Sequence, residues 1–274
     1  MTVKQRYFIE LAYDGTNYHG WQVQQNAVSV QEELNKALST ILRQPIETTG
    51  CGRTDTGVHA REFFAHFDVE EVQGSLFIDH SKNKDEMSDA STTDYEPRTM
   101  NQQLNNKVRG LNSILPPDIS IKNIIAVDAG AHARFDATLR SYQYHIHFHK
   151  DPFLRGYSWQ LRDVPDLELM NQAAAIIMEY IDFSCFSKSN TQVKTNNCKI
   201  TRAEWVNTDQ GIVFHISADR FLRNMVRAIV GTLIMVGKGE IVPGAVRQII
   251  ESKNRSNAGT SVPACGLYLT EVKY

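Results

Sequence analysis

The sequence lacks the features of membrane, secreted and metal-cluster proteins. None of its apolar runs approaches the roughly 18 residues that a transmembrane helix needs, and the chain enters a strand pattern at Tyr7 with no signal-peptide pattern before it. The four cysteines, at positions 51, 185, 198 and 265, form no C-x-x-C pair and no metal-ligand spacing. We therefore expect a cytoplasmic protein with free thiols and no structural metal.

The sequence also lacks the positive net charge that is typical of nucleic-acid-binding proteins. Its 29 basic and 31 acidic residues give a net charge of −2. Residues 68–98 alone hold nine acidic and three basic side chains, which leaves 26 basic and 22 acidic residues elsewhere. This segment is polar and without periodicity over residues 81–99, which predicts an acidic surface insertion at about 70–100. The remaining body is mildly basic and permits an RNA partner without requiring one.

The order of the periodic segments is the same in both halves of the chain. In residues 1–127 we expect strand, helix, strand, strand, helix and strand at residues 7–13, 30–41, 46–49, 63–69, 101–114 and 119–127. Residues 128–274 repeat that order, with strands at 141–150, 201–207, 212–218 and 266–273 and helices at 165–180, 220–237 and 243–252. Each half is thus βαββαβ, the ferredoxin-like order. We predict an α+β protein of two such domains, 1–127 and 128–274, with antiparallel sheets side by side, helices on one face and an active-site cleft between them.

A loop between two of these strands, residues 52–60, carries the most informative side chains. Asp55 stands between Gly52 and Gly57, with Arg53 before it and His59 after it. Asp and Gly favour tight turns in which the carboxylate bonds nearby backbone, so an isolated D-x-G is most simply a turn. Here Arg and His accompany the carboxylate and an apolar strand follows, which favours a carboxylate presented for chemistry.

The apolar segment 220–237 carries three arginines at helical spacing. Arg220, Arg223 and Arg227 occur at i, i+3 and i+7 of a segment otherwise dominated by apolar side chains. A buried guanidinium needs a partner, so Arg227 pairs either with some nearby carboxylate or with Asp55 across the cleft. We favour Asp55, because a neighbouring cation keeps a carboxylate ionised, as a nucleophile requires.

The strand at 141–150 has one aromatic face and one histidine face. Tyr144 is most simply a core residue, whereas Tyr142 stands at the strand start, where a phenol can stack on a base and offer its hydroxyl. His145, His147 and His149 alternate on the opposite face, but no carboxylate or thiolate accompanies them nearby. We therefore expect a solvated or RNA-facing surface there and no metal site.

Five sequence blocks resemble the TruA family of tRNA pseudouridine synthases. They are Tyr13-Asp14-Gly15 with residues 18–22, the loop 52–60, residues 132–137 leading to Tyr142 and Tyr144, residues 221–227, and residues 266–269. The blocks occur in family order and span nearly the whole chain, so their combination is highly specific. One departure is the acidic insertion, which is longer than is usual in the family.

The resemblance implies an isomerase that converts uridine to pseudouridine at positions 38, 39 and 40 in the anticodon stem-loop of tRNAs. By position, Asp55 matches the catalytic aspartate and Tyr142 the tyrosine that contacts the target base. Arg227 matches the arginine paired with the aspartate, and Arg53 an arginine that helps displace the target nucleotide from its stack. The family also implies a homodimer that needs no cofactor and no metal. Further candidate RNA contacts are His59, Arg134, Arg140, Arg220, Arg223 and Lys188.

Two alternative functions fit parts of the sequence. A non-catalytic RNA-binding paralogue would be free to lose Asp55, Tyr142 or Arg227, and all three are present. Asp55-Thr56-Gly57 also matches the D-T-G of aspartic proteases, whose two carboxylates share a proton. Only one D-T-G occurs, so a protease would need its second aspartate from a homodimer. For the isomerase, the sequence leaves open whether Asp55 attacks carbon or promotes a glycal intermediate.

Overall fold

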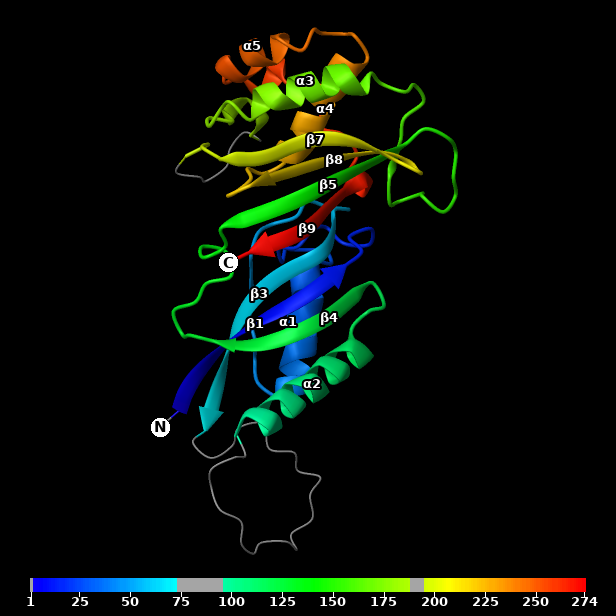
Figure 1. The fold of residues 1–274 in the computed structure, drawn as a ribbon. Helices are drawn as coiled ribbons and strands as arrows, with labels where there is room; N and C mark the ends of the chain where they lie inside the picture. Colours follow the sequence, from blue (N-terminus) through cyan, green and yellow to red (C-terminus); the bar gives the residue numbers. More distant parts are fainter. Residues whose placement is uncertain (1, 73–95, 188–194) are drawn as a thin grey trace, which may run out of the picture.

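The computed structural model describes residues 2–72, 96–187 and 195–274, which form one continuous sheet with helices packed against it (Figure 1). The N-terminal half contains β1 (Thr2–Tyr13), α1 (Val30–Leu42), β2 (Thr49–Gly50), β3 (His59–Val72), α2 (Glu96–Ile114) and β4 (Ile119–Val127). The C-terminal half contains β5 (Leu139–His147), β6 (Trp159–Gln160), α3 (Leu167–Ile177), β7 (Ile200–Thr208), β8 (Gly211–Ala218), α4 (Met225–Gly237), α5 (Ala245–Glu251) and β9 (Leu267–Lys273). Most of the predicted acidic insertion, and Lys188, lie outside the described residues.

The strand order confirms the predicted fold class. The sheet runs β4-β1-β3-β9-β5-β8-β7, with β2 paired to β3 and β6 paired to β5. Within each half the four principal strands therefore lie in the order fourth-first-third-second, as in a ferredoxin-like unit. The two halves meet where β3 pairs in parallel with β9, at His59↔Tyr268 and Ala60↔Leu269, near the middle of Figure 1. The predicted domain boundary at residue 127 stays a prediction.

The helices of both halves cover the same face of the sheet. Paired residues on neighbouring strands point to the same side, and the pairs Tyr13↔Ala60, Ala60↔Leu269, Leu269↔Tyr142 and Tyr142↔Ile216 cross the junction between the halves. Tyr13 belongs to the buried cluster that includes Val30 and Leu34 of α1, and Ile216 to the cluster that includes Met225 and Ile229 of α4. One helix layer thus spans both halves, as predicted.

Helix α1 forms where its sequence signals predict it. Ser29 caps its N-terminus by accepting a hydrogen bond from the Glu32 backbone amide at 3.3 Å. The apolar positions Val30, Leu34 and Leu38 are buried against the sheet. Arg43 ends the helix in the left-handed conformation, with φ 55°.

Helix α4 begins later than the sequence predicts, and this changes the position of two arginines. The prediction extended the helix from residue 220, but it starts at Met225, after Asn224 in the left-handed conformation with φ 65°. The Asp219 carboxylate accepts hydrogen bonds from the amides of Lys199 and Arg220 at 2.8 and 2.7 Å, which fixes the irregular start of the segment before the helix. The predicted helical stripe of three arginines is therefore wrong, because Arg220 and Arg223 precede the helix.

Candidate active site

The loop that carries Asp55 connects β2 to β3 and is fixed by the first sequence block. The Trp21 amide donates to the Thr54 carbonyl at 3.3 Å, and the Gly57 amide donates to the Tyr18 carbonyl at 3.3 Å. The hydroxyls of Tyr13 and Thr54 share a hydrogen bond of 2.9 Å. The two motifs thus form one unit that holds Asp55 at the junction of the two halves.

Close backbone contact explains why this unit needs glycine at position 20. Gly20 has φ +87°, and a Cβ placed on it would lie 2.3 Å from the Thr54 carbonyl oxygen. Only glycine adopts this conformation and allows this approach without strain. Gly20 therefore lets the residues before Trp21 pack directly on the backbone next to Asp55.

Two guanidinium groups flank the Asp55 carboxylate. Arg227, in the first turn of α4, donates from Nη1 to Asp55 Oδ2 at 3.5 Å, and its Nε donates to the Val262 carbonyl at 2.7 Å. Arg223 lies on the other side, with Nε 3.7 Å from Asp55 Oδ1. The side chains of Asp55 and Arg227 are 24% and 20% exposed, whereas that of Arg223 is 62% exposed. The pairing of Asp55 with Arg227 predicted from sequence is present, and a second, more solvated arginine accompanies it.

Tyr142 lies on β5 beside this ion pair, on the helix-covered face. Its ring packs edge-on against Phe221, with the centroids 5.1 Å apart at an interplanar angle of 87°. Burial raises the pKa of Tyr142 well above its usual value, and the negative charge of Asp55 adds to this effect. The phenol is therefore protonated at neutral pH. Tyr144 is fully buried and donates its hydroxyl to the Pro263 carbonyl at 2.7 Å, as expected of a core residue.

Known proteins resemble this chain over nearly its whole length. A family model described as tRNA pseudouridine synthase matches residues 180–274. A protein from Bacteroides thetaiotaomicron named tRNA pseudouridine synthase A is 48% identical over 273 residues, which cover 98% of this chain and 91% of the relative. A protein of the same name from Clostridium acetobutylicum is 36% identical over 268 residues, 97% of this chain and 98% of the relative. This chain belongs to the tRNA pseudouridine synthase family.

Several arginines predicted as RNA contacts in this synthase-family chain gather beside the Asp55 loop. Arg53 and Arg134 are exposed, and Arg220 lies in the irregular segment before α4. Desolvation by the neighbouring protein atoms lowers the pKa of Arg134, and the positive charges of Arg53, Arg220 and Arg140 contribute to the same shift. The Arg140 guanidinium bonds the carbonyls of Arg134, of Asp219 next to Arg220, and of Cys51 two residues before Arg53, so these four residues form one cationic cluster. We refer to Arg53, Arg134, Arg140 and Arg220 as the arginine cluster.

Within this cluster Arg140 is held by backbone carbonyls. Its Nη1 donates to the carbonyls of Ala137 and Asp219 at 2.6 and 2.7 Å. Its Nη2 donates to the carbonyls of Cys51 and Arg134 at 3.0 and 2.6 Å. Arg140 thus joins the start of the Asp55 loop to the C-terminal half. These bonds occupy both Nη groups of Arg140. Arg140 therefore contributes positive charge to the cluster, but its Nη groups are not free to donate hydrogen bonds to RNA.

His59 is part of the structural support and does not face solvent. It is 2% exposed, stacks on Tyr268 with centroids 4.6 Å apart, and has its Nε2 3.1 Å from the Gly156 carbonyl oxygen. Its Nδ1 accepts from the Gly15 amide at 3.1 Å and also lies 3.0 Å from Asp14 Oδ1. The protein therefore uses both ring nitrogens, and the expected RNA contact of His59 finds no support in this position.

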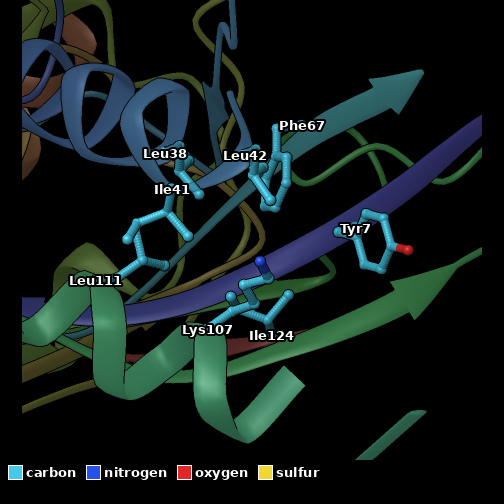
Figure 2. Close-up of a pocket in the computed structure, with 8 residues that line it drawn as sticks. All are labelled: Tyr7, Leu38, Ile41, Leu42, Phe67, Lys107, Leu111 and Ile124. Atoms are coloured by element: carbon cyan, nitrogen blue, oxygen red, sulfur yellow. The ribbon is translucent and has the colours of Figure 1, made fainter. Parts of the chain in front are cut away.

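The cavity drawn in Figure 2 lies away from Asp55. It is lined by side chains of α1, α2, β1, β3 and β4, and its volume of about 10 Å³ has room for no more than one water molecule. The labelled side chains that line it are Tyr7, Leu38, Ile41, Leu42, Phe67, Lys107, Leu111 and Ile124. It is a packing gap in the core, because a nucleoside cannot enter a space of this size.

The histidine face of β5 differs from its predicted solvated character. His147 is buried, and its Nδ1 has no hydrogen-bond partner. Burial and, to a smaller extent, the positive charge of Arg61 lower the pKa of His145 to about 4. Within the described ranges, no three side chains of His, Cys, Asp or Glu are grouped to hold a metal ion. The prediction of a solvated surface is therefore wrong for His147, which is buried at the end of β5, where it pairs with Gln160 of β6.

Proposed function

We propose that this chain isomerises uridine to pseudouridine at positions 38, 39 and 40 in the anticodon stem-loop of tRNAs. The observation that carries this proposal is the position of Asp55, whose two carboxylate oxygens face Arg227 and Arg223 next to Tyr142. The names of the relatives support a tRNA substrate. The particular positions rest on the resemblance of the sequence blocks to the TruA family.

The reaction requires one bond to break and another to form between the same two rings. The C1′–N1 bond breaks, uracil turns, a C1′–C5 bond forms, and the proton leaving C5 is balanced by one taken up at N1. The product is an isomer of the substrate, so no oxidant and no external group is consumed. In our proposal ionised Asp55 either adds to carbon or promotes a glycal intermediate, and Arg227 holds its charge in place.

The remaining residues have supporting roles in this proposal. The target nucleotide must leave its stack, which costs a few kcal/mol. Arg53 is exposed on the loop two residues before Asp55, where it is available to occupy the vacated space. Tyr142 is available to stack on uracil and to take part in the proton transfer at C5. The arginine cluster together with Arg223 is available to neutralise phosphates.

The proposal includes a homodimer in the cytoplasm. All four cysteines are free thiols, and burial raises the pKa values of Cys51, Cys185 and Cys198 to about 12. Such thiols suit a reducing compartment. No helix among the described residues is both long and apolar enough to cross a membrane. Light scattering during size-exclusion chromatography measures the oligomeric state directly.

The two alternatives predict different outcomes. An aspartic protease needs two carboxylates that share a proton, but the partners of Asp55 are guanidinium groups. A non-catalytic RNA-binding paralogue binds tRNA and releases no product. The test incubates the protein with a tRNA transcript labelled with tritium at C5 of uridine, and measures tritium release and the position of pseudouridine. Substitution of cytidine for uridine at positions 38, 39 and 40 must abolish release; binding without release would contradict the proposal.

A further inference from the structure

An exposed phenyl ring lies beside the arginine cluster, in the segment that connects β4 to β5. Phe135 is 73% exposed. The Arg134 guanidinium carbon lies 5.8 Å from the centroid of the Phe135 ring, and the His132 ring lies 4.2 Å from it at an interplanar angle of 31°. Three side chains that recognise nucleic acid thus present one aromatic and cationic surface. We call His132, Arg134 and Phe135 the aromatic platform.

The backbone beneath this platform is fixed at its base. Ala133 is fully buried, its amide donates to His66 Nδ1 at 3.1 Å, and its carbonyl accepts from the Tyr274 hydroxyl at 2.8 Å. The amides of Arg134 and Phe135 donate to His132 Nδ1 at 3.1 and 3.3 Å. The fold therefore holds the segment rigidly while the phenyl ring remains in solvent.

Folding stability does not explain an exposed phenyl ring on a fixed backbone. A phenylalanine contributes to stability through the area that it buries, and Phe135 buries little. A ring on a backbone held by hydrogen bonds binds a flat partner at a lower entropic cost than a ring on a mobile loop, because the segment is already ordered. The platform is therefore built to receive a ligand rather than to support the core.

The platform is also joined to the Asp55 loop. Arg140 Nη2 donates both to the carbonyl of Arg134, within the platform, and to that of Cys51, at the start of the Asp55 loop. The charge of Arg53, two residues before Asp55, contributes to the lowered pKa of Arg134. A strand of RNA that places a nucleotide at Asp55 therefore brings neighbouring nucleotides to the platform.

We propose that the aromatic platform stacks on an unpaired nucleobase of the tRNA loop close to the target uridine. This proposal rests on the proposed function, because it takes its substrate from it. Phe135 supplies the stacking face, His132 supports the ring from one side, and Arg134 contacts the phosphate of the stacked nucleotide. Every base has a π-face, so the platform recognises an unpaired base and not its sequence.

The test compares Phe135→Ala with a matched variant. Phe153→Ala is the control, because Phe153 is 88% exposed but lies on the loop after β5, where its amide donates to the Asp151 carboxylate. Phe135→Trp retains an aromatic face and serves as the rescue variant. The measurement is the Kd for tRNA, repeated with transcripts in which each loop nucleotide near the target is made abasic in turn.

We expect Phe135→Ala to raise Kd about 5- to 160-fold, the range for losing one base–aromatic stack. Phe153→Ala and Phe135→Trp should remain within about twofold of the parent protein. At one loop position the abasic transcript should cause the same loss in the parent protein and no further loss in Phe135→Ala.

Three results would overturn the platform. The first is an unchanged Kd for tRNA in Phe135→Ala. The second is that the effects of Phe135→Ala and of the abasic substitution on Kd add at every loop position. The third is that Phe135→Ala loses a protein dimer while its affinity for RNA stays unchanged. Because the coupling is measured on binding, it also separates the two proposals. A parent protein that binds tRNA without forming pseudouridine contradicts the proposed function, while coupling to one abasic position still supports the platform.

Discussion

Replacing Arg227 and Arg223 one at a time tests how the protein stabilises the Asp55 carboxylate. The two guanidinium groups lie 3.5 and 3.7 Å from different oxygens of the same carboxylate. Distance alone therefore gives them almost equal Coulomb energies. Their environments differ, because the Arg227 side chain is 20% exposed and that of Arg223 is 62% exposed.

The dielectric environment decides the relative magnitudes. At an effective dielectric constant of about 20, a pair at this distance is worth about 4 kcal/mol, and in bulk water about 1 kcal/mol. The interaction of the mostly buried Arg227 with Asp55 is closer to the larger value. Solvent and salt weaken the interaction of Arg223 with Asp55 to the smaller value or below it. Arg227→Leu should therefore raise the activation free energy by about 2 to 4 kcal/mol, which lowers kcat/KM roughly 30- to 1000-fold. Arg223→Leu should lower it about fivefold or less, and this small effect should diminish as salt is added.

The assay is single-turnover release of tritium from C5-labelled uridine in tRNA, at low and high salt. Thermal unfolding of each variant serves as the control for folding, because Arg227 also donates to the Val262 carbonyl. Arg227→Lys keeps a positive charge and should recover part of the loss. Equal effects of Arg227→Leu and Arg223→Leu, or a folded Arg227→Leu variant with full activity, would refute the role given to burial.

Three further predictions follow from other contacts. Arg140→Lys should lower the melting temperature and kcat together, because one ammonium group cannot span carbonyls on both sides of the junction; unchanged values would show that Arg140 does not position the Asp55 loop. Tyr142→Phe should lower kcat about 100-fold or more with unchanged Kd for tRNA. Because burial raises the pKa of Tyr142, tyrosinate absorbance should show no ionisation of this residue below about pH 10. Burial, then His132 and Arg6, lower the pKa of His66 to about 4, so the fold favours neutral His66 and its contribution to stability should be lost as pH falls from about 6.5 to 4. His66→Asn keeps an acceptor for the Ala133 amide and should weaken that pH dependence; an identical pH profile would contradict the assignment.

Local sequence patterns predicted the fold because most of its elements follow local rules. The apolar periodicity and the Ser29 cap predict α1 almost to the residue, and repeated βαββαβ order predicts the two strand orders. The start of α4 was beyond these rules. The hydrogen bonds of Asp219 and the left-handed conformation of Asn224 keep residues 220–224 out of the helix, and the apolar pattern does not reveal either feature. The joining of both halves into one sheet was also not predicted, because β3 and β9 are remote in sequence.

The candidate site was predictable where a residue's chemistry required a partner. An arginine in an apolar segment needs a carboxylate, and this reasoning brought Arg227 to Asp55. Solvent exposure was not predictable in the same way. His59 and Arg140 lie in blocks that resemble functional motifs, but the structure commits them to backbone groups. Phe135 stands within such a block too, and only the structure shows that its ring is left in solvent.

The most direct test of the account is the activity of Asp55→Asn. Asparagine has nearly the same shape as aspartate but carries no negative charge and cannot act as the anionic group. We predict that this variant folds, binds tRNA with an affinity within a few-fold of the parent protein, and forms no detectable pseudouridine. Turnover at the parent rate would contradict the account, because it would show that the reaction does not depend on the Asp55 carboxylate.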